Sequence, residues 1–295
     1  MSERRIESTA SKTADMTCGC RAMSTMEKNP LYRSDDWVAV KLLPRKIRFF
    51  TRIPAARSML VRMLGPQGVY EWVIARTRYI DAVMLKALAE DFSQVVIFGA
   101  GFDSRAIRFQ QQLSDRRVFE LDAPTTQAMK IRQLERRGVV LPPNLVFVPV
   151  NFEKETAAEK LSTAGFHTGA KTLVIVEGVL QYLKPESAEG TLRTIAEQVG
   201  PGSWLVFDYA HASVLRGEGT SYGEQRMTRG VDRFGESWQF GLEESEVEPF
   251  LARHGFGQRD RKSPEQLEEM YFQDTDGRIV GRVNGTQSIV WAEKG

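Results

Sequence analysis

Apolar positions along the chain follow two alternating patterns from residue 94 onward. Short continuous apolar runs predict strands at 94–99, 117–122, 145–150, 172–177 and 203–209, and segments at helical spacing predict helices after residues 103, 124, 153 and 185. A continuous run such as Thr172–Val176 is typical of a strand that is buried on both faces. The alternation therefore predicts a doubly wound α/β architecture with a mostly parallel sheet.

The two flanks of this region have different patterns. Residues 1–30 read as poorly ordered or loosely helical, short helical pieces follow up to Gly65-Pro66, and helical spacing over Glu71–Asp91 predicts one long helix. Residues 210–240 are polar and rich in glycine, which predicts a long loop or a small cap. A helix is expected at 243–254, with closing strands at 256–262 and 286–292 joined by a segment rich in Asp and Gly that could form a hairpin.

The turn after the first predicted strand contains the most informative residues. Gly99 and Gly101 follow an apolar run, and the next strand ends on Asp122, 21 residues after Gly101. Glycines allow a ligand to approach the backbone closely, and an acid at the end of the second strand can accept hydrogen bonds from ribose hydroxyls. The pattern predicts a nucleoside site, although an ordinary glycine turn between a strand and a helix would look the same.

The residues after the glycines indicate which nucleoside fits. Dinucleotide sites favour G-x-G-x-x-G, because the pyrophosphate lies on a helix N-terminus, but the third glycine position is Ser104 here. Asp103 would repel a pyrophosphate and attract the α-ammonium of S-adenosylmethionine. S-adenosylmethionine is therefore favoured over NAD, although a nicotinamide oxidoreductase stays open on the glycine turn alone.

Length and composition restrict the class of protein. A chain of 295 residues can bury a full core, no run of eighteen apolar residues is present, and the polar stretch Met1–Asp15 lacks the apolar segment of a secretory signal, so we expect a cytoplasmic protein. Cys18 and Cys20 do not match the C-x-x-C zinc spacing, and the chain has only three histidines. We therefore expect no metal site.

The net charge of +2 conceals a strongly basic segment. Residues 37–70 contain seven bases and no acid, so the remainder of the chain carries −5. The bases lie between apolar residues within 37–62, and they are Lys41, Arg45, Lys46, Arg48, Arg52, Arg57 and Arg62. A cap over an anionic substrate, an interfacial membrane segment and a solvated helix face all fit this pattern. Nucleic acid is disfavoured, because aromatic residues beyond Phe49-Phe50 are not clustered with the bases.

Four ordered motifs together resemble one enzyme family. They are Thr77-Arg-Tyr-Ile-Asp81, Phe98-Gly-Ala-Gly-Phe-Asp-Ser-Arg105, Phe119-Glu-Leu-Asp122 and Val176-Glu-Gly-Val-Leu-Gln-Tyr-Leu183. With Trp238–Leu242 they resemble the S-adenosylmethionine-dependent methyltransferases related to leucine carboxyl methyltransferase, over about residues 70–255. The resemblance implies a Rossmann-like class I methyltransferase with a seven-stranded sheet whose last strand is antiparallel. We also expect an N-terminal helical cap (1–70) and a methyltransferase domain (71–295) whose insertion 210–240 covers the substrate pocket.

The resemblance also implies roles for cofactor-binding residues. Arg78 would bind the methionine carboxylate, for which a planar guanidinium is well suited. Gly99 and Gly101 would admit the cofactor, with Asp103 close by, and Asp122 would accept from the ribose hydroxyls. A further group of expected contacts lies at the strand ends and comprises Glu120, Glu177 and Gly178.

The end of the third predicted strand departs from the family pattern. The family usually has an aspartate before an apolar residue, and this chain has Asn151-Phe152. An asparagine keeps an acceptor oxygen for the adenine amine but lacks the charge. Binding of adenine at Asn151 and Phe152 is still expected.

The methyl donor determines what the protein must supply. Its sulfonium is already a good leaving group, so the protein must hold a nucleophile in line with the methyl carbon and exclude water. A carboxylate is ionised at neutral pH and needs no general base, whereas a phenol or hydroxyl would need one, for which His211 is the candidate. Tyr182 and Tyr209 are candidates for positioning the substrate, and either could instead be a core aromatic residue.

The expected function is an O-methyltransferase acting on a carboxylate of a small molecule or peptide terminus. The basic segment 37–62 would then favour an anionic substrate. The alternatives are methylation of a phenolic or hydroxyl natural product, a non-catalytic nucleoside-binding protein, and an NAD-dependent oxidoreductase. A membrane-surface contact by residues 37–62 is compatible with each, and the sequence does not indicate an oligomeric state.

Overall fold

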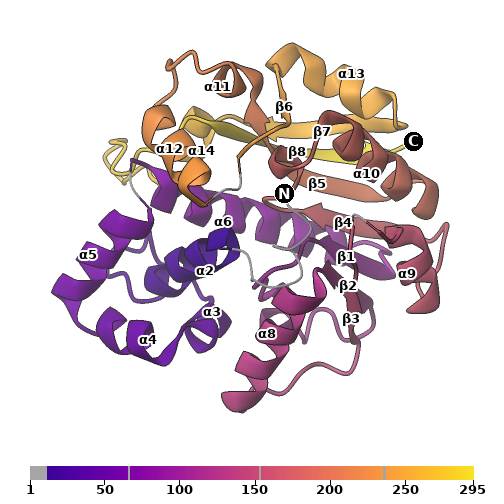
Figure 1. Ribbon diagram of the computed structural model, residues 1–295, viewed down its shortest axis with the longest axis horizontal. Helices are drawn as coiled ribbons and strands as arrows, with labels where there is room; N and C mark the ends of the chain where they lie inside the picture. The colour runs from indigo at the N-terminus through magenta and orange to yellow at the C-terminus, as the bar shows by residue number, and fades with distance from the viewer. Residues whose placement is uncertain (1–11, 66, 153, 235–236) are drawn as a thin grey trace.

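The computed structural model describes residues 12–65, 67–152, 154–234 and 237–295. At its centre is one sheet with the strand order β3-β2-β1-β4-β5-β8-β7, in which β8 is antiparallel to both neighbours and β6 pairs with the end of β5 (Figure 1). The strands are β1 (Gln94–Phe98), β2 (Arg117–Asp122), β3 (Leu145–Pro149), β4 (Thr172–Val176), β5 (Trp204–His211), β6 (Gly241–Leu242), β7 (Phe256–Lys262) and β8 (Gln287–Lys294). The expected doubly wound fold with an antiparallel last strand is confirmed.

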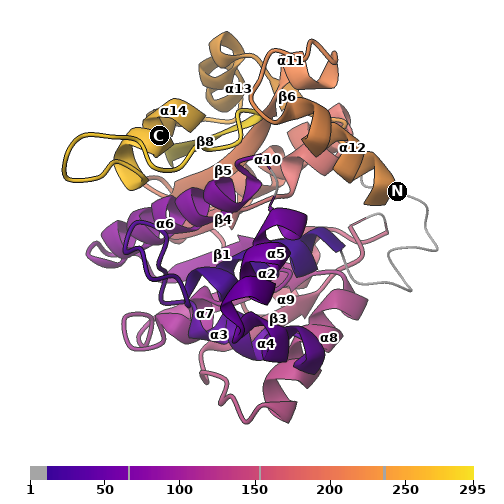
Figure 2. The same cartoon turned by 90° about the vertical axis from the view of Figure 1, so that its left-hand side faces the viewer.

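Helices cover both faces of this sheet and form a separate group near the N-terminus. The helices are α2 (Lys12–Ser24), α3 (Trp37–Leu42), α4 (Arg45–Thr51), α5 (Pro54–Leu64), α6 (Val69–Leu88), α7 (Arg105–Arg108), α8 (Pro124–Arg136), α9 (Ala157–Thr163), α10 (Pro185–Gln198), α11 (Ala212–Leu215), α12 (Glu224–Phe234), α13 (Val247–Ala252) and α14 (Pro264–Tyr271). Two 3-10 turns lie at Leu180–Tyr182 and Glu244–Glu246. Figures 1 and 2 show α2 to α5 gathered on one side of the molecule, next to α6.

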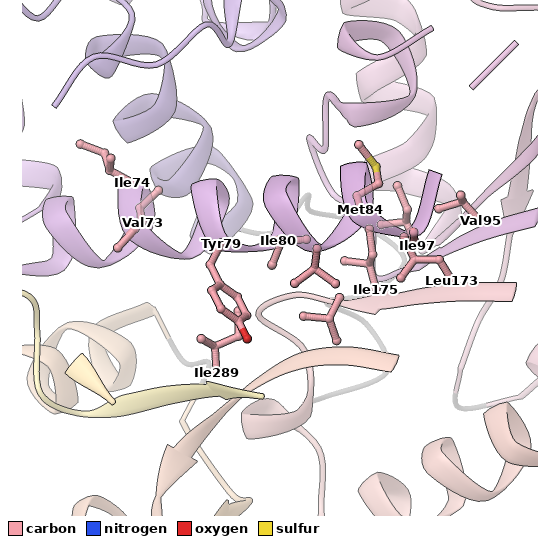
Figure 3. Close-up of a cluster of buried hydrophobic side chains, with 14 of the residues drawn as sticks. Val73, Ile74, Tyr79, Ile80, Met84, Val95, Ile97, Leu173, Ile175 and Ile289 are labelled. Atoms are coloured by element: carbon pink, nitrogen blue, oxygen red, sulfur yellow. The ribbon is translucent and has the colours of Figure 1, made fainter. Parts of the chain in front are cut away.

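The central strands divide their side chains between two apolar layers. Successive side chains of a strand point to opposite faces, so Val95 and Ile97 of β1 pack on the α6 side, whereas Val96 and Phe98 belong to the cluster on the other face. Figure 3 shows the first layer, in which Ile80 and Met84 of α6 lie against the sheet. Burial on both faces explains why these strands read as continuous apolar runs.

Three expectations about the flanks need correction. Residues 12–24 form a helix with Cys20 and Ala22 fully buried, so this part of 1–30 is neither poorly ordered nor loose; residues 1–11 lie outside the described part. Of the two alternatives for the polar segment 210–240, a long loop or a small cap, the plain loop is wrong because the segment contains α11 and α12; residues 235–236 lie outside the described part. The strands β7 and β8 are antiparallel, but α14 lies in their connection, so they do not form a simple hairpin.

Candidate functional site

A cavity of about 930 Å³ opens at the carboxyl ends of β1, β2 and β4. This is the edge at which open α/β sheets bind their ligands. The expected residues Gly99, Gly101, Asp103 and Asp122 all line it. The walls come from α6 and α10 and also from α2 and Met227 of α12, which lie in the two segments, 1–70 and 210–240, expected to cover the pocket.

The glycine turn after β1 depends on backbone conformations that favour glycine. Gly99 has φ +59°, and a Cβ there would lie 2.5 Å from Val179 Cγ2. Gly101 has φ +50°, and its N–H donates to the Asp122 carboxylate. Asp122 also accepts from the N–H of Ala123 at 2.6 Å, while burial raises the pKa of Asp122. The turn therefore holds the Asp122 carboxylate at the cavity wall.

Two buried arginines organise the acids on the next strand ends. Arg105 Nη1 lies 2.7 Å from Glu177 Oε2 and also pairs with Asp103, while Arg76 Nε lies 3.0 Å from Glu177 Oε1. Burial alone would raise the pKa of Glu177, but the guanidinium groups of Arg105 and Arg76 outweigh it and lower the pKa to about 2. Glu177 and Gly178 both line the cavity, as expected, and Glu177 is held there as a carboxylate.

Arg76, rather than the expected Arg78, lies at the cavity. Arg78 is directed to the loop at residues 30–33, where its guanidinium donates to the carbonyls of Leu31 at 2.7 Å, Pro30 at 3.1 Å and Arg33. Arg76 is buried and lines the cavity together with Trp72, one helical turn earlier. Residues two apart on a helix point to nearly opposite sides, which explains why only one of the two arginines reaches the site.

Two other expected cofactor contacts are not at the cavity wall. Glu120 is buried in an ion pair with Lys130, whose Nζ lies 2.5 Å from its Oε2, and burial raises the pKa of Glu120 to about 7. Asn151 is also absent from the lining, and its N–H donates to Glu155 Oε2 at 2.8 Å. Phe152, in contrast, lines the cavity next to Phe98, with ring centroids 6.4 Å apart.

The three residues expected to position or activate the substrate are separated. Tyr182 lines the cavity. Tyr209 is fully buried among core residues, and His211 lies beyond it, with Nε2 2.8 Å from Ser288 Oγ. Neither Tyr209 nor His211 lines the cavity, and burial lowers the pKa of His211. All three histidines of the chain are described, and none of them lines the cavity.

Several lining residues were not anticipated from the sequence. Trp72 Nε1 and Gln181 Oε1 are buried polar atoms without a hydrogen-bond partner, and both side chains line the cavity. Arg21 of α2 lines it as well, bonded to the Phe102 carbonyl at 2.5 Å and to Asp36 at 2.9 Å. A helical stripe shared by Trp72, Val73 and Arg76 is the signal that could have identified the α6 residues.

The basic segment does not cover the cavity. None of the residues 37–64, all of which are described, lines it. Cys18 and Cys20 are buried free thiols, and burial raises the pKa of each to about 12. Within the described ranges, no group of three or more His, Cys, Asp or Glu residues is arranged to hold a metal ion. Nor does any helix in those ranges have the length and apolar character needed to cross a bilayer.

Comparison with known proteins agrees with this geometry. The chain is 28% identical to YktD of Bacillus subtilis over 89% of its own length and 91% of that protein, and 31% identical to a protein of Frankia alni over 75% and 80% of the two chains. Both relatives are named as candidate S-adenosyl-L-methionine-dependent methyltransferases. A DUF574 family protein from Streptomyces avermitilis has the same fold, with a TM-score of 0.62 and 13% identity over 99% of this chain and 100% of that chain.

A family-level match covers more than half of the chain. The sequence profile described as leucine carboxyl methyltransferase matches residues 14–196, which begin in α2 and end in α10. This range includes the glycine turn, Asp122, Glu177 and Arg76, and the match confirms the family resemblance of the four motifs and the methyl donor that it implies. The chain belongs to the leucine carboxyl methyltransferase family, a family of S-adenosylmethionine-dependent methyltransferases.

Proposed function

We propose that the protein methylates a carboxylate oxygen of a small molecule or a peptide terminus. The observation that carries this proposal is the absence of histidine from the cavity lining, although all three histidines are described. A carboxylate acceptor is ionised at neutral pH and reacts without a general base, whereas a phenol requires a base near its proton. The acids that line the cavity among the described residues are already paired: Asp103 and Glu177 with Arg105, Glu155 with Lys160, and Asp122 with two backbone N–H groups. The contents of the cavity therefore favour the acceptor that needs no base.

The residues at the cavity fit the methyl donor. We assign the ribose hydroxyls to Asp122, which is held by two backbone N–H groups, and the adenine to the neighbourhood of Phe152. We assign the methionine carboxylate to Arg76 in place of Arg78, because Arg76 lines the cavity. Asp103 lines it too and offers a negative charge to the α-ammonium.

The chain's own residues perform binding, orientation and exclusion of water in this reaction. Bound S-adenosylmethionine supplies a methyl group already activated on a sulfonium; its C–S bond breaks as the C–O bond to the acceptor forms, and no proton is transferred. Trp72 offers a buried indole N–H and Gln181 a buried amide oxygen, which can orient polar atoms of the acceptor. We assign the exclusion of water to the cavity walls from α2 and α10.

The experiment uses purified protein, S-adenosylmethionine labelled on the methyl group, and matched panels of carboxylic and phenolic acceptors. A carboxylate acceptor yields a methyl ester, which releases labelled methanol in mild base, and His211→Gln retains the activity. A base-stable methyl ether, with a rate that rises with pH and is lost in His211→Gln, would contradict the proposal. Calorimetry with S-adenosylmethionine and with NAD, each without acceptor, tests cofactor binding separately; no heat with the methyl donor would exclude the assigned cofactor site.

A further inference from the structure

The surface of α4 and α5 combines exposed apolar side chains with bases. Here we call the residues 45–63 on these two helices and the link between them the basic apolar face. Neither helix is well buried: Thr51 is the one buried residue of α4, and α5 has none. The large apolar side chains on this face are Phe49, Phe50, Ile53, Met59 and Met63, which are 43–65% exposed. Isolated exposed apolar residues are common, but five so close together require a reason.

The exposed positions follow helical periodicity. In α5 the exposed residues are 54, 55, 58, 59, 62 and 63, which occupy one face of a helix and bring Met59, Arg62 and Met63 together. In α4 the exposed residues include Arg45, Lys46, Phe49 and Phe50. Ordinary surface helices turn their apolar side toward the core, whereas these two helices present apolar residues and bases to the solvent on the same side.

Among the described residues, no acid neutralises the positive charge of this face. The six bases of the basic apolar face, five in the two helices and Arg52 in the link, form no salt bridge with any acid of the described chain, and residues 37–64 contain no acid. The pKa of Arg48 is lowered, first by burial and then by the neighbouring guanidinium groups of Arg137, Arg52 and Arg45. The partner of this face must therefore be anionic.

We propose that the basic apolar face docks on an anionic lipid surface. Bases at the level of the phosphates, with Phe, Ile and Met side chains entering the acyl boundary, match the mixed pattern of this face. Protein interfaces instead concentrate apolar residues in one desolvated centre with a polar rim. A symmetric contact with a second copy would place these six bases against the same six bases, which disfavours self-association.

The location of the face is compatible with docking of the active protein. The face lies outside the cavity lining, at the edge of the molecule formed by α4 and α5 in Figure 1. It connects to the cavity through α2: Leu64 of α5 packs on Gly19, and Arg21 of the same helix lines the cavity. The residues that would contact the lipid surface therefore do not block the cavity.

The test is co-sedimentation of the full chain with vesicles of phosphatidylcholine containing 30% phosphatidylglycerol. We expect binding to these vesicles, little binding to pure phosphatidylcholine vesicles, and weakening with added salt. Arg45→Gln/Arg52→Gln should weaken binding roughly 30-fold, because each base near an anionic leaflet contributes roughly fivefold. Phe49→Ser/Phe50→Ser should weaken it as well, through loss of the apolar contact.

Matched controls use exposed residues elsewhere on the chain. Arg193→Gln/Arg278→Gln removes two exposed bases, and Ile279→Ser/Val280→Ser removes two adjacent exposed apolar side chains. Both controls should retain vesicle binding, and circular dichroism should show all four variants folded. Equal loss in variants and controls, or no binding to anionic vesicles, overturns the proposal. Binding to polyglutamate but not to vesicles would assign the face to an acidic protein, and salt-sensitive dimers abolished by Phe49→Ser/Phe50→Ser would assign it to self-association.

Discussion

Arg76 Nη1 on α6 lies 2.8 Å from Asp208 Oδ2 on β5, in a pair that is almost fully buried. The same guanidinium contacts Glu177 at the end of β4, so one side chain of α6 joins two neighbouring strands at the edge that carries the cavity. Removal of one partner from a buried ion pair leaves an uncompensated charge. This pair therefore couples the integrity of the cavity to the stability of the fold.

Arg76→Met should destabilise the protein by about 3–5 kcal/mol, because Asp208 and Glu177 lose a buried countercharge. Urea unfolding measures this change. Arg193→Met, at an exposed site, is the control and should change stability by less than about 0.5 kcal/mol. Arg76→Met/Asp208→Asn should recover part of the loss, and a double variant that is as unstable as the sum of the singles would contradict the coupling.

The pKa of Glu177 predicts acid sensitivity. Its pKa of about 2 in the folded protein lies below the ordinary value near 4.5, so its contribution to stability is complete above pH 4.5 and is lost as the pH falls toward 2. Glu177→Gln should be less stable than the wild type at pH 5, and it should lose less stability between pH 4.5 and pH 2.5. Urea unfolding at the two pH values tests this, and equal losses in both proteins would contradict it.

The pair Glu120 and Lys130 predicts the opposite pH dependence. The pKa of Glu120 is raised by burial to about 7, so the folded state favours the protonated carboxyl and stability falls as the pH rises from 4.5 to 7. Glu120→Gln/Lys130→Met removes both charges together and should make stability less dependent on pH in this window. Thermal unfolding at pH 5 and 7.5 provides the comparison, in which identical pH slopes would argue against the raised pKa.

Gly99→Ala should weaken both the fold and cofactor binding. A Cβ at this position combines a φ of +59° with a contact at 2.5 Å to Val179. Gly138→Ala is a matched control, because its φ is +64° but no atom lies within 4 Å of the added Cβ. The control should lose about 1–2 kcal/mol from the backbone conformation alone. Gly99→Ala should lose more and should bind S-adenosylmethionine more weakly in calorimetry; equal losses in the two variants would mean that the contact with Val179 has no effect.

Asp122→Asn should weaken binding of S-adenosylmethionine by about tenfold or more while leaving the fold intact. The one amide oxygen can still accept from Gly101 or from Ala123, but not from both, and the charge that strengthens hydrogen bonds from ribose hydroxyls is lost. Calorimetry gives the dissociation constants, with the exposed Asp115→Asn as the control. An unchanged affinity in Asp122→Asn would move the ribose to another acid.

The strands could be predicted from the sequence because parallel strands buried on both faces produce long apolar runs, as in β4. The connection between β7 and β8 could not be recognised from its Asp and Gly content. Helix α14 begins with a capping box in which Ser263 and Gln266 bond reciprocally, a signal that the sequence contains. The Asp and Gly residues that follow favour a turn, and they hide this short helix in a reading of composition. Local composition therefore predicts a hairpin where the structure has a short capped helix followed by a turn.

The site illustrates a different limit. The glycine turn and Asp122 lie next to each other because two neighbouring parallel strands end at the same edge, which the order of motifs already implies. Arg76 and Arg78 lie on opposite sides of α6. A motif of consecutive residues does not indicate which side of the helix faces the cavity, whereas the buried positions that begin at Trp72 do. The residues of α2 that line the cavity reach it through tertiary packing, and no pattern in the sequence of this helix predicts which of them do so.

Because α2 forms part of the cavity wall, a shortened protein must keep this helix to keep the complete site. A protein shortened to begin at Val69 would retain every strand, the glycine turn, Asp122 and Glu177. It would lose Thr13, Thr17 and Arg21, and with them one wall of the cavity. It would also expose Val73 and Ile74, which share a buried cluster with Cys20 and Met23 of the missing helix. Shortening the other end is no safer, because β8 extends to Lys294 and pairs with both β5 and β7.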